Sequence, residues 1–249
     1  MKRFAVIGGT GLEELEGLSR LRAHTLETPY GAPSRTVEEG KLHGHRVFFL
    51  QRHGAPQAIP PHKINYRANM WALKSLGVTD VLAINAVGGI TPAMVTGTLV
   101  IPDQLIDYTW GREHSIDDGS SGELLHIDFT HPYDGHLRRA LLAAAERHNI
   151  AHLGSAVHGV TQGPRLESAA EIDRLERDGC DVVGMTGMPE AALARELDMA
   201  YAAICMVVNP AAGKSEQPIT VAMMRDTLAR EAAVVVQLLG YLFKAAGSD

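Results

Sequence analysis

Cysteines and long apolar runs are scarce in this sequence. Only 2 Cys occur among 249 residues, and both lie in apolar stretches, so we expect buried thiols in a reducing compartment rather than a disulfide framework. No stretch reaches the roughly 18 apolar residues that a membrane span requires. The apolar run after the basic start, residues 4–7, is too short for a signal peptide. We therefore expect a cytoplasmic protein with no membrane partner.

Basic and aromatic residues are also scarce. Against 29 Asp and Glu there are 23 Lys and Arg, which gives a formal net charge of -6, and 5% of the residues are aromatic. A nucleic-acid-binding surface needs basic side chains to neutralise phosphates and aromatic side chains on which bases stack. We therefore exclude polymeric nucleic acid as a partner. The 12 His show no H-E-x-x-H spacing and the 2 Cys no C-x-x-C spacing, so we expect no metal site.

The hydrophobic pattern predicts one α/β domain over residues 1–249, because no linker, repeat or low-complexity tract divides the chain. Short apolar runs alternate with helical stretches, which indicates a sheet buried on both faces. The predicted strands are residues 3–7, 46–51, 78–85, 98–101, 154–160, 181–184 and 200–208. The predicted helices are residues 63–76, 135–148, 166–178, 189–197 and 220–245. Residues 111–123 lack periodicity and form either a mobile surface loop or an interface element.

Candidate binding residues follow the predicted strands, where α/β proteins collect ligands. Residues 8–11 (GGTG) allow a close backbone approach, and Thr10 adds a hydroxyl, which suits a phosphate but also an ordinary tight turn. A dinucleotide fingerprint is disfavoured, because Glu14 stands where its third glycine is needed. Arg52 and His53 together suit a tetrahedral anion, although either can be a surface or structural residue.

The other candidates each have a purely structural alternative. Residues 85–89 (NAVGG) can form a β-bulge or turn, and Asn209, which precedes a proline, can belong to a turn. Glu167 can be a carboxylate favoured in the first turn of a helix. Met185 can fill the core, and Thr186 can cap the helix that follows it.

Six motifs carry a resemblance that covers essentially the whole chain. They are IGGTGL (7–12), TPYGAPS (28–34), RHG (52–54), INYRAN-WALK (64–74), GPRLE-AAE (163–171) and VVGMTGMPEAALARE (182–196). In this order they resemble the 5′-methylthioadenosine phosphorylase and purine nucleoside phosphorylase family. The resemblance implies a single-domain mixed α/β fold around a distorted, barrel-like central sheet, usually assembled as a homotrimer. It also implies cleavage of the N-glycosidic bond of a purine nucleoside by inorganic phosphate, with no metal or organic cofactor.

The resemblance further implies roles for individual residues. It assigns the phosphate to Thr10, Arg52, His53, Asn85, the backbone N–H of Ala86, and Thr186. Asn85 departs from the Thr or Ser that is more frequent in the family. Met185 is expected under the ribose, and Leu166, Glu167 and Asn209 around the ribose and base.

The base-contacting residues favour a 6-oxopurine. Such a base presents N1–H as a donor and O6 as an acceptor, whereas adenine presents the opposite pattern. An ionised Glu167 can accept from N1–H, and Asn209 can donate to O6 and stabilise the charge and proton that appear at N7 as the base leaves. The adenine-preferring branch resembles this chain less here, with a small hydroxyl residue and a D-x-D pattern at these two points.

The start of the last helix favours an apolar 5′ substituent. Val221 and Met224 lie three residues apart on one helical face and suit a methylthio group, although either can be core packing. In the family a neighbouring subunit usually closes this pocket, and His126 is the candidate residue. We therefore expect phosphorolysis of S-methyl-5′-thioinosine. The alternatives are 5′-methylthioadenosine phosphorylase, inosine/guanosine phosphorylase and, from another class, a non-catalytic nucleotide-binding module.

Overall fold

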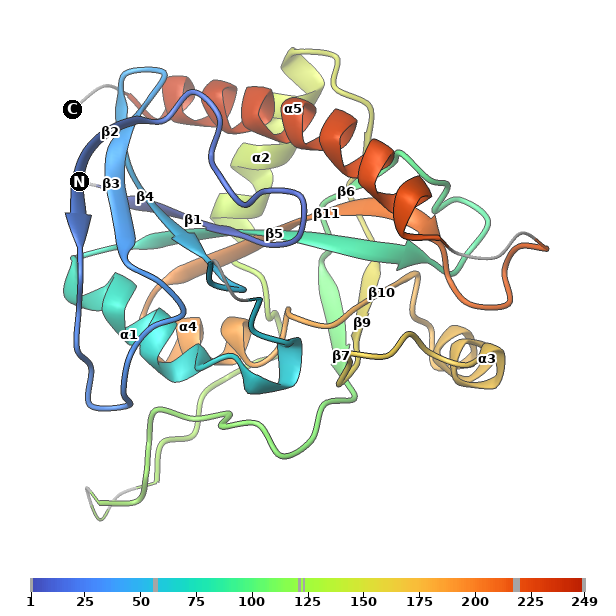
Figure 1. The fold of residues 1–249 in the computed structure, drawn as a ribbon, viewed down its shortest axis with the longest axis horizontal. Coiled ribbons are helices and arrows are strands. Elements are labelled where there is room, and N and C mark those ends of the chain that lie inside the picture. Colours follow the sequence, from blue (N-terminus) through green and yellow to red (C-terminus); the bar gives the residue numbers. More distant parts are fainter. Residues whose placement is uncertain (1, 56–57, 121, 123, 217–219, 248–249) are drawn as a thin grey trace.

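The computed structural model describes residues 2–55, 58–120, 122, 124–216 and 220–247, without the side chains of residues 221–225. A mixed sheet of eleven strands runs through its centre (Figure 1). In chain order the strands are β1 (Phe4–Gly8), β2 (Ser19–His24), β3 (Val37–Leu42), β4 (His45–Gln51), β5 (Asp80–Gly89), β6 (Leu99–Val100), β7 (Gln104–Asp107), β8 (His152–Leu153), β9 (Val157–Val160), β10 (Val182–Gly184) and β11 (Ala200–Pro210).

Polar side chains cap the start of three of the helices, α1, α2 and α3. They are α1 (Tyr66–Ser75), α2 (Gly135–Arg147), α3 (Ala169–Arg177), α4 (Glu190–Glu196) and α5 (Val221–Ala246), with a short 3₁₀ turn at Pro61–Lys63. The side chains of Asn65 and Asp134 accept hydrogen bonds from backbone N–H groups in the first turns of α1 and α2. At α3, Ser168 and Glu171 form a capping box.

The strands are arranged in the order β2-β3-β4-β1-β5-β10-β9-β7, and β11, β6 and β8 branch from β5. Within the described residues no pairing joins the ends of this sheet, so the mixed α/β fold is confirmed but the sheet is not closed into a barrel. The four strands β4, β1, β5 and β11 are adjacent in this order and run parallel to one another. Their register places Gly8 beside Gln51, and Ile7 beside Ala83, so the carboxyl ends of β1 and β4 meet beside the middle of β5.

The central strands are buried on both faces because helices cover both. In β1, Ala5 and Ile7 pack into one core cluster with Met70 of α1, while Val6 packs into a second cluster with Leu238 of α5. Figure 1 shows α1 and α4 on one side of the sheet and α2 and α5 on the other. Every residue of β1 is therefore buried, which is why the strand is apolar throughout and not alternating.

The predicted helices and strands are all present, with shifted ends and four omissions. The short strands β2, β7 and β8 and the polar strand β3 were not predicted. Residues 85–89, expected as a loop or bulge, instead continue β5 to Gly89. The helix expected from residue 166 begins at Ala169, because Ser168 caps it there.

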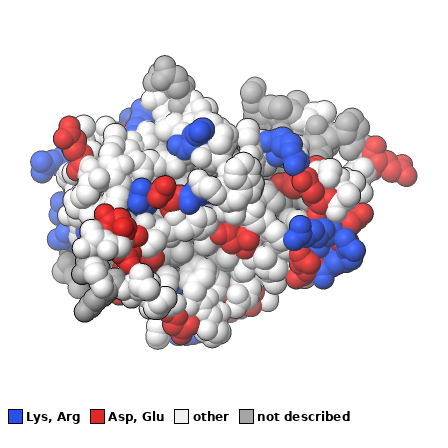
Figure 2. All heavy atoms as spheres, turned by 90° about the horizontal axis from the view of Figure 1, so that it is seen from below, with Lys and Arg blue, Asp and Glu red and all other residues white. Residues whose placement is uncertain are grey.

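The surface and the thiols agree with the composition. No helix in the described part of the chain is long and apolar enough to cross a membrane. On the face drawn in Figure 2, acidic and basic side chains are interspersed and do not gather into a basic patch. Cys180 and Cys205 are both buried free thiols, as predicted.

Candidate active site

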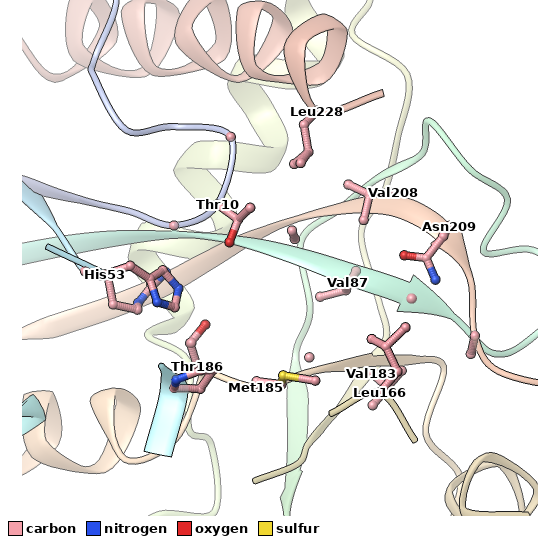
Figure 3. Close-up of a pocket in the computed structure, with 18 of the residues that line it drawn as sticks. Thr10, His53, Val87, Leu166, Val183, Met185, Thr186, Val208, Asn209 and Leu228 are labelled. Carbon is pink, nitrogen blue, oxygen red and sulfur yellow. The ribbon is translucent and has the colours of Figure 1, made fainter. Parts of the chain in front are cut away.

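A cavity of about 630 Å³ lies where the predicted site residues converge. Its wall includes Thr10, Arg52, His53, Ala86, Leu166, Glu167, Met185, Thr186 and Asn209. Figure 3 shows Thr10, His53 and Thr186 at one end, which we call the phosphate end, and Leu166 and Asn209 at the other, the base end. Residues from six separate sequence segments therefore meet in one space.

The glycine turn after β1 brings backbone close to Arg52. A Cβ atom placed on Gly9 would lie 2.7 Å from Nη1 of Arg52 and 2.7 Å from the carbonyl oxygen of Ile84. Gly11 has a φ of +84°, a backbone conformation that glycine adopts without strain. The turn thus needs glycine at both positions, and Thr10 between them is exposed to the cavity.

Arg52 is fully buried and already paired with a carboxylate. Its Nη2 donates to Oε2 of Glu190 at 3.0 Å, its Nε donates to Oε1, and its Nη1 donates to the carbonyl of Ile84 at 3.0 Å. Burial opposes the charged form, but the charge and hydrogen bonds of Glu190 outweigh it and raise the pKa of Arg52. A guanidinium has five N–H donors. The N–H groups of Arg52 that do not bond to Glu190 or Ile84 remain to donate at the phosphate end.

Within the described residues, only one ring nitrogen of His53 has a hydrogen-bond partner. Its Nδ1 lies 2.8 Å from the carbonyl oxygen of Ile59, and because a carbonyl can only accept, Nδ1 carries the proton. Burial lowers the pKa of His53; the bond to Ile59 opposes this shift, and the charge of Arg52 adds to it. The neutral ring therefore presents Nε2 as an acceptor, suited to a protonated phosphate oxygen.

Thr186 is held by Asn85, which lies behind the cavity wall. The Thr186 hydroxyl donates to Oδ1 of Asn85 at 3.0 Å. Asn85 itself is buried, is not part of the cavity lining, and has no partner for its Nδ2 within the described structure. Asn85 thus lies behind Thr186, and the direct phosphate contact expected of it stays a prediction. The alternative role of Thr186 as a helix cap is wrong, because Pro189 is the N-cap of α4.

A β-bulge directs Asn209 into the base end. The pairing of β5 with β11 shifts register between Val207 and Asn209, so Val208 is an extra residue. Successive strand residues normally point to opposite faces, yet Val208 and Asn209 both line the cavity. Nδ2 of Asn209 donates to the carbonyl of Pro210 at 2.6 Å, which leaves Oδ1 and one amide hydrogen for a ligand.

Glu167 is oriented by a threonine. The Thr161 hydroxyl donates to Oε1 of Glu167 at 2.6 Å, and Thr161 follows β9 directly. Glu167 precedes the cap residue Ser168, so it is not in the first turn of α3 as the structural alternative required. Its second oxygen is left to accept a hydrogen bond at the base end.

Met185 lies between the two ends of the cavity, as Figure 3 shows. The sulfur is fixed from below by the loop that carries Gly163, because a Cβ on that glycine would lie 2.5 Å from Sδ. The floor is thus apolar and polarisable at the place where the resemblance expects the ribose.

The side chains of Val221 and Met224 lie outside the described residues. Leu228, four residues after Met224 and therefore on the same face of α5, does line the cavity. His126 is exposed and does not line the cavity of its own chain. It lies in the long segment between β7 and α2 that projects away from the body in Figure 1.

Four residues of the site were not predicted from the sequence: Glu190, Thr161, Val208 and Leu228. Glu190 and Thr161 act through Arg52 and Glu167, and no spacing rule marks such partners. Leu228 continues the helical face of Val221 and Met224, so extending that face by one turn predicts it. In the described part of the chain no group of three or more His, Cys, Asp or Glu is placed to hold a metal ion.

Known proteins that are similar to this chain are phosphorylases. The family model described as "Phosphorylase superfamily" matches residues 3–244. The chain is 52% identical over 243 residues, 96% of this chain and 99% of the relative, to "Probable S-methyl-5'-thioinosine phosphorylase" of Pseudomonas syringae pv. tomato. It is 42% identical over 244 residues, covering 96% and 91%, to "6-oxopurine nucleoside phosphorylase" of Pyrococcus furiosus.

A solved structure is similar over the whole fold. Methylthioadenosine phosphorylase from Schistosoma mansoni in complex with adenine superposes with a TM-score of 0.94 at 30% identity, covering 100% of this chain and 93% of that one.

Proposed function

The chain belongs to the phosphorylase superfamily, and we propose that it cleaves S-methyl-5′-thioinosine with inorganic phosphate, which yields hypoxanthine and 5-methylthioribose 1-phosphate. The protein is a nucleoside phosphorylase and thus a pentosyltransferase. One observation carries the choice of base. The base end of the cavity combines Glu167, fixed as an acceptor by Thr161, with Asn209, whose Oδ1 and one amide hydrogen remain available.

These two side chains match the edge of a 6-oxopurine. The free oxygen of Glu167 accepts from N1–H, and the free amide hydrogen of Asn209 reaches O6 while Oδ1 accepts from N7–H. Adenine instead turns the lone pair of N1 toward the carboxylate and leaves both unpaired. A mismatch of buried polar groups can discriminate by about 10⁴-fold. Relatives named as acting on 6-oxopurine nucleosides and on S-methyl-5′-thioinosine support this assignment.

The reaction proceeds from the phosphate end toward the base end. Thr10, Arg52, the backbone N–H of Ala86, and Thr186 hold the phosphate, and Nε2 of His53 accepts from its P–OH group. A phosphate oxygen forms the bond to C1′ as the bond from C1′ to N9 breaks and its electron pair leaves with the purine. The ribosyl centre passes over Met185 with oxocarbenium character. Asn209 is the catalytic residue, because it stabilises the charge and then the proton that appear at N7.

The apolar end of α5 supports a methylthio substituent. Leu228 and Val208 line the cavity, Leu228 against Gly11 of the glycine turn, and Figure 3 shows both on the side opposite Met185. A 5′-hydroxyl needs a hydrogen-bond partner that these side chains do not supply. Val221 and Met224 extend the same helical face in the sequence, which supports their assignment to this pocket.

A homotrimer completes the site in this proposal. His126 is exposed in the projecting segment, beside Leu124 and Leu125, whose exposed fractions are 77% and 47%. Exposed apolar side chains next to a polar one are typical of an interface. His126 of one subunit then closes the 5′ pocket of its neighbour.

The buried free thiols support a cytoplasmic location, where thiols stay reduced. In this proposal no metal or organic cofactor takes part.

The test compares phosphate-dependent base release from 5′-methylthioinosine, 5′-methylthioadenosine and inosine, with a control that lacks phosphate. Preference for methylthioinosine supports both the base and the 5′ assignments. Preference for methylthioadenosine overturns the roles of Glu167 and Asn209, and preference for inosine overturns the apolar 5′ pocket. Binding of all three without turnover overturns the activity and supports a nucleotide-binding module.

A further inference from the structure

Arg112 lies outside every motif of the sequence, yet its guanidinium is the most heavily hydrogen-bonded group beside the cavity. It is buried, with an exposed fraction of 9%. Its acceptors are Oε1 and the carbonyl of Gln162, the carbonyls of Thr161, Met185 and Met188, and the hydroxyl of Tyr66, at distances from 2.6 to 3.2 Å. Arg112 does not line the cavity itself.

Five of the six acceptors belong to two segments that lead into the cavity wall, one after β9 and one after β10, which we call the two walls; the sixth is the hydroxyl of Tyr66 in α1. Strands β9 and β10 are paired as far as Val160 and Gly184, and the N–H of Thr161 still donates to the Gly184 carbonyl at 2.8 Å. Beyond this point the two segments separate. One leads through Gln162 to Glu167 at the base end, and the other carries Met185. Arg112 bridges them where sheet pairing has ended.

The bridge reaches the ribose floor at Met185 directly and the carboxylate of Glu167 through Thr161. Nη1 of Arg112 donates to the carbonyl of Met185 at 2.9 Å. Nη2 donates to the carbonyl of Thr161 at 3.2 Å, and the hydroxyl of this same Thr161 orients Glu167. A planar guanidinium can hold several carbonyls in fixed directions, whereas the ammonium of lysine presents all its hydrogens from one atom.

The segment that carries Arg112 is itself fixed to the body of the protein. The Ser115 hydroxyl donates to Oε1 of Glu196 at 2.8 Å, and the N–H of Ile116 donates to Oε2 at 2.6 Å. Tyr30 also donates from its hydroxyl to the carbonyl of Ile116 at 3.0 Å. This part of residues 111–123 is therefore anchored, and it holds Arg112 against the two walls.

We propose that Arg112 is a positioning residue that sets the distance between the ribose floor at Met185 and the base-reading carboxylate of Glu167. It touches no substrate, and the proposal rests on the proposed function. Its loss lets the two walls move apart, so the glycosidic bond is no longer aligned with the phosphate, and the carboxylate no longer meets N1–H at a fixed place. A displacement of about 1 Å can cost roughly 10²-fold in rate.

The test uses Arg112→Lys and Arg112→Gln, with Arg174→Gln as the matched control. Arg174 is an exposed arginine that stacks over the Tyr108 ring at 5.7 Å, outside the cavity lining. For both Arg112 variants we expect kcat with methylthioinosine to fall by about 10²-fold while the KM for phosphate stays near that of the wild type. We also expect the preference for methylthioinosine over methylthioadenosine to shrink. Arg174→Gln should change neither.

Chemical rescue separates positioning from general destabilisation. Guanidinium at millimolar concentration should restore part of the kcat of Arg112→Ala and leave the control unaffected. Gln162→Leu removes one acceptor of Arg112, Oε1 of Gln162, and should lower kcat and the preference for methylthioinosine more weakly. This variant replaces the Arg112 variants in the test if those do not fold. A wild type that cleaves no nucleoside overturns the proposed function. An active wild type with unchanged kcat and base preference in folded Arg112→Lys, or in Gln162→Leu, overturns the role of Arg112 alone.

Discussion

Arg52 and Glu190 form an ion pair in which neither side chain is exposed to solvent. The pair is bidentate, and the hydroxyl of Tyr201 also donates to Oε2 of Glu190 at 3.0 Å. Because Arg52 follows β4 and Glu190 is the first residue of α4, the pair joins a helix to the phosphate end of the sheet. The arginine charge is balanced before phosphate arrives, so we expect phosphate to be held mainly by well-placed N–H and O–H donors.

Glu190→Gln should lower the stability of the protein and increase its stabilisation by phosphate. Removing one partner of a buried pair leaves an uncompensated charge, and we expect the free energy of unfolding to fall by about 3–5 kcal/mol. Bound phosphate can then neutralise Arg52, so phosphate should raise the melting temperature more in the variant than in the wild type. Urea denaturation and thermal melts with and without phosphate measure both effects.

The control for this prediction is Glu176→Gln. Glu176 forms an exposed pair with Lys214 at 2.6 Å, and surface pairs contribute only about 0–1 kcal/mol. If Glu190→Gln is as stable as this control, or if phosphate stabilises the variant no more than the wild type, the pair does not govern the charge of the phosphate end.

The fold could be predicted from the sequence wherever a segment is buried on a regular face. The apolar run of β11 is a local signal that needs no knowledge of distant contacts. The cap of α3 at Ser168 is also a local signal, although the predicted helix began three residues too early. The strands β7 and β8 have four and two residues, and their conformation depends on pairing with β9 and β6. Such pairing is a tertiary effect, and no local pattern records it.

Most side chains that face the cavity were predicted, apart from Val208 and Leu228, whereas Glu190 and Thr161, which act through a neighbour, were not. Thr10, His53 and Asn209 follow or end strands, and that rule is sufficient to find them. Asn85 obeys the same rule but lies behind Thr186, because the strand continues to Gly89 and alternates its faces. Arg112 obeys no rule, since its partners are backbone carbonyls of segments far away in the sequence.

The buried His158 should make the protein sensitive to acid. Its Nε2 has no partner in the described structure, and burial, with a smaller effect from Arg52, lowers its pKa to about 4. The unfolded chain binds this proton near pH 6.5. Between these pH values the unfolded state binds more protons than the folded state. The contribution of His158 to the free energy of unfolding is therefore fully present above pH 6.5 and is lost as the pH falls toward 4, by about 3 kcal/mol in total.

Urea denaturation at several pH values between 4 and 7 checks this prediction. His158→Gln should flatten the dependence of the unfolding free energy on pH, whatever its cost at pH 7. His136, an exposed histidine on α2, supplies the control variant His136→Gln, which should keep the wild-type slope. An unchanged slope in His158→Gln would show that other groups cause the acid sensitivity.

Exchange of the two base-reading residues should change the preferred base. Glu167→Ser with Asn209→Asp removes the acceptor for N1–H and places a carboxylate where the N6 amino group of adenine can donate. We expect the ratio of kcat/KM for methylthioinosine to that for methylthioadenosine to fall by about 10²-fold or more. Thr161→Val releases Glu167 from its hydrogen bond and also removes the longer contact of the Thr161 hydroxyl with the Gly184 carbonyl at 3.3 Å, and it should lower this ratio less. An unchanged ratio in the double variant would mean that other residues read the base.

Leu228 should determine the preference for the 5′ substituent. It is buried against the glycine turn, since a Cβ on Gly11 would lie 2.7 Å from its Cδ2, and it lines the cavity. Leu228→Ala removes apolar contact that a methylthio group gains and a hydroxyl does not, and a methylene-sized contact discriminates by roughly tenfold or more. We expect kcat/KM for methylthioinosine to fall about tenfold with little change for inosine. Leu21→Ala, on the exposed strand β2, is the control, and equal losses for both substrates in Leu228→Ala would place the 5′ group elsewhere.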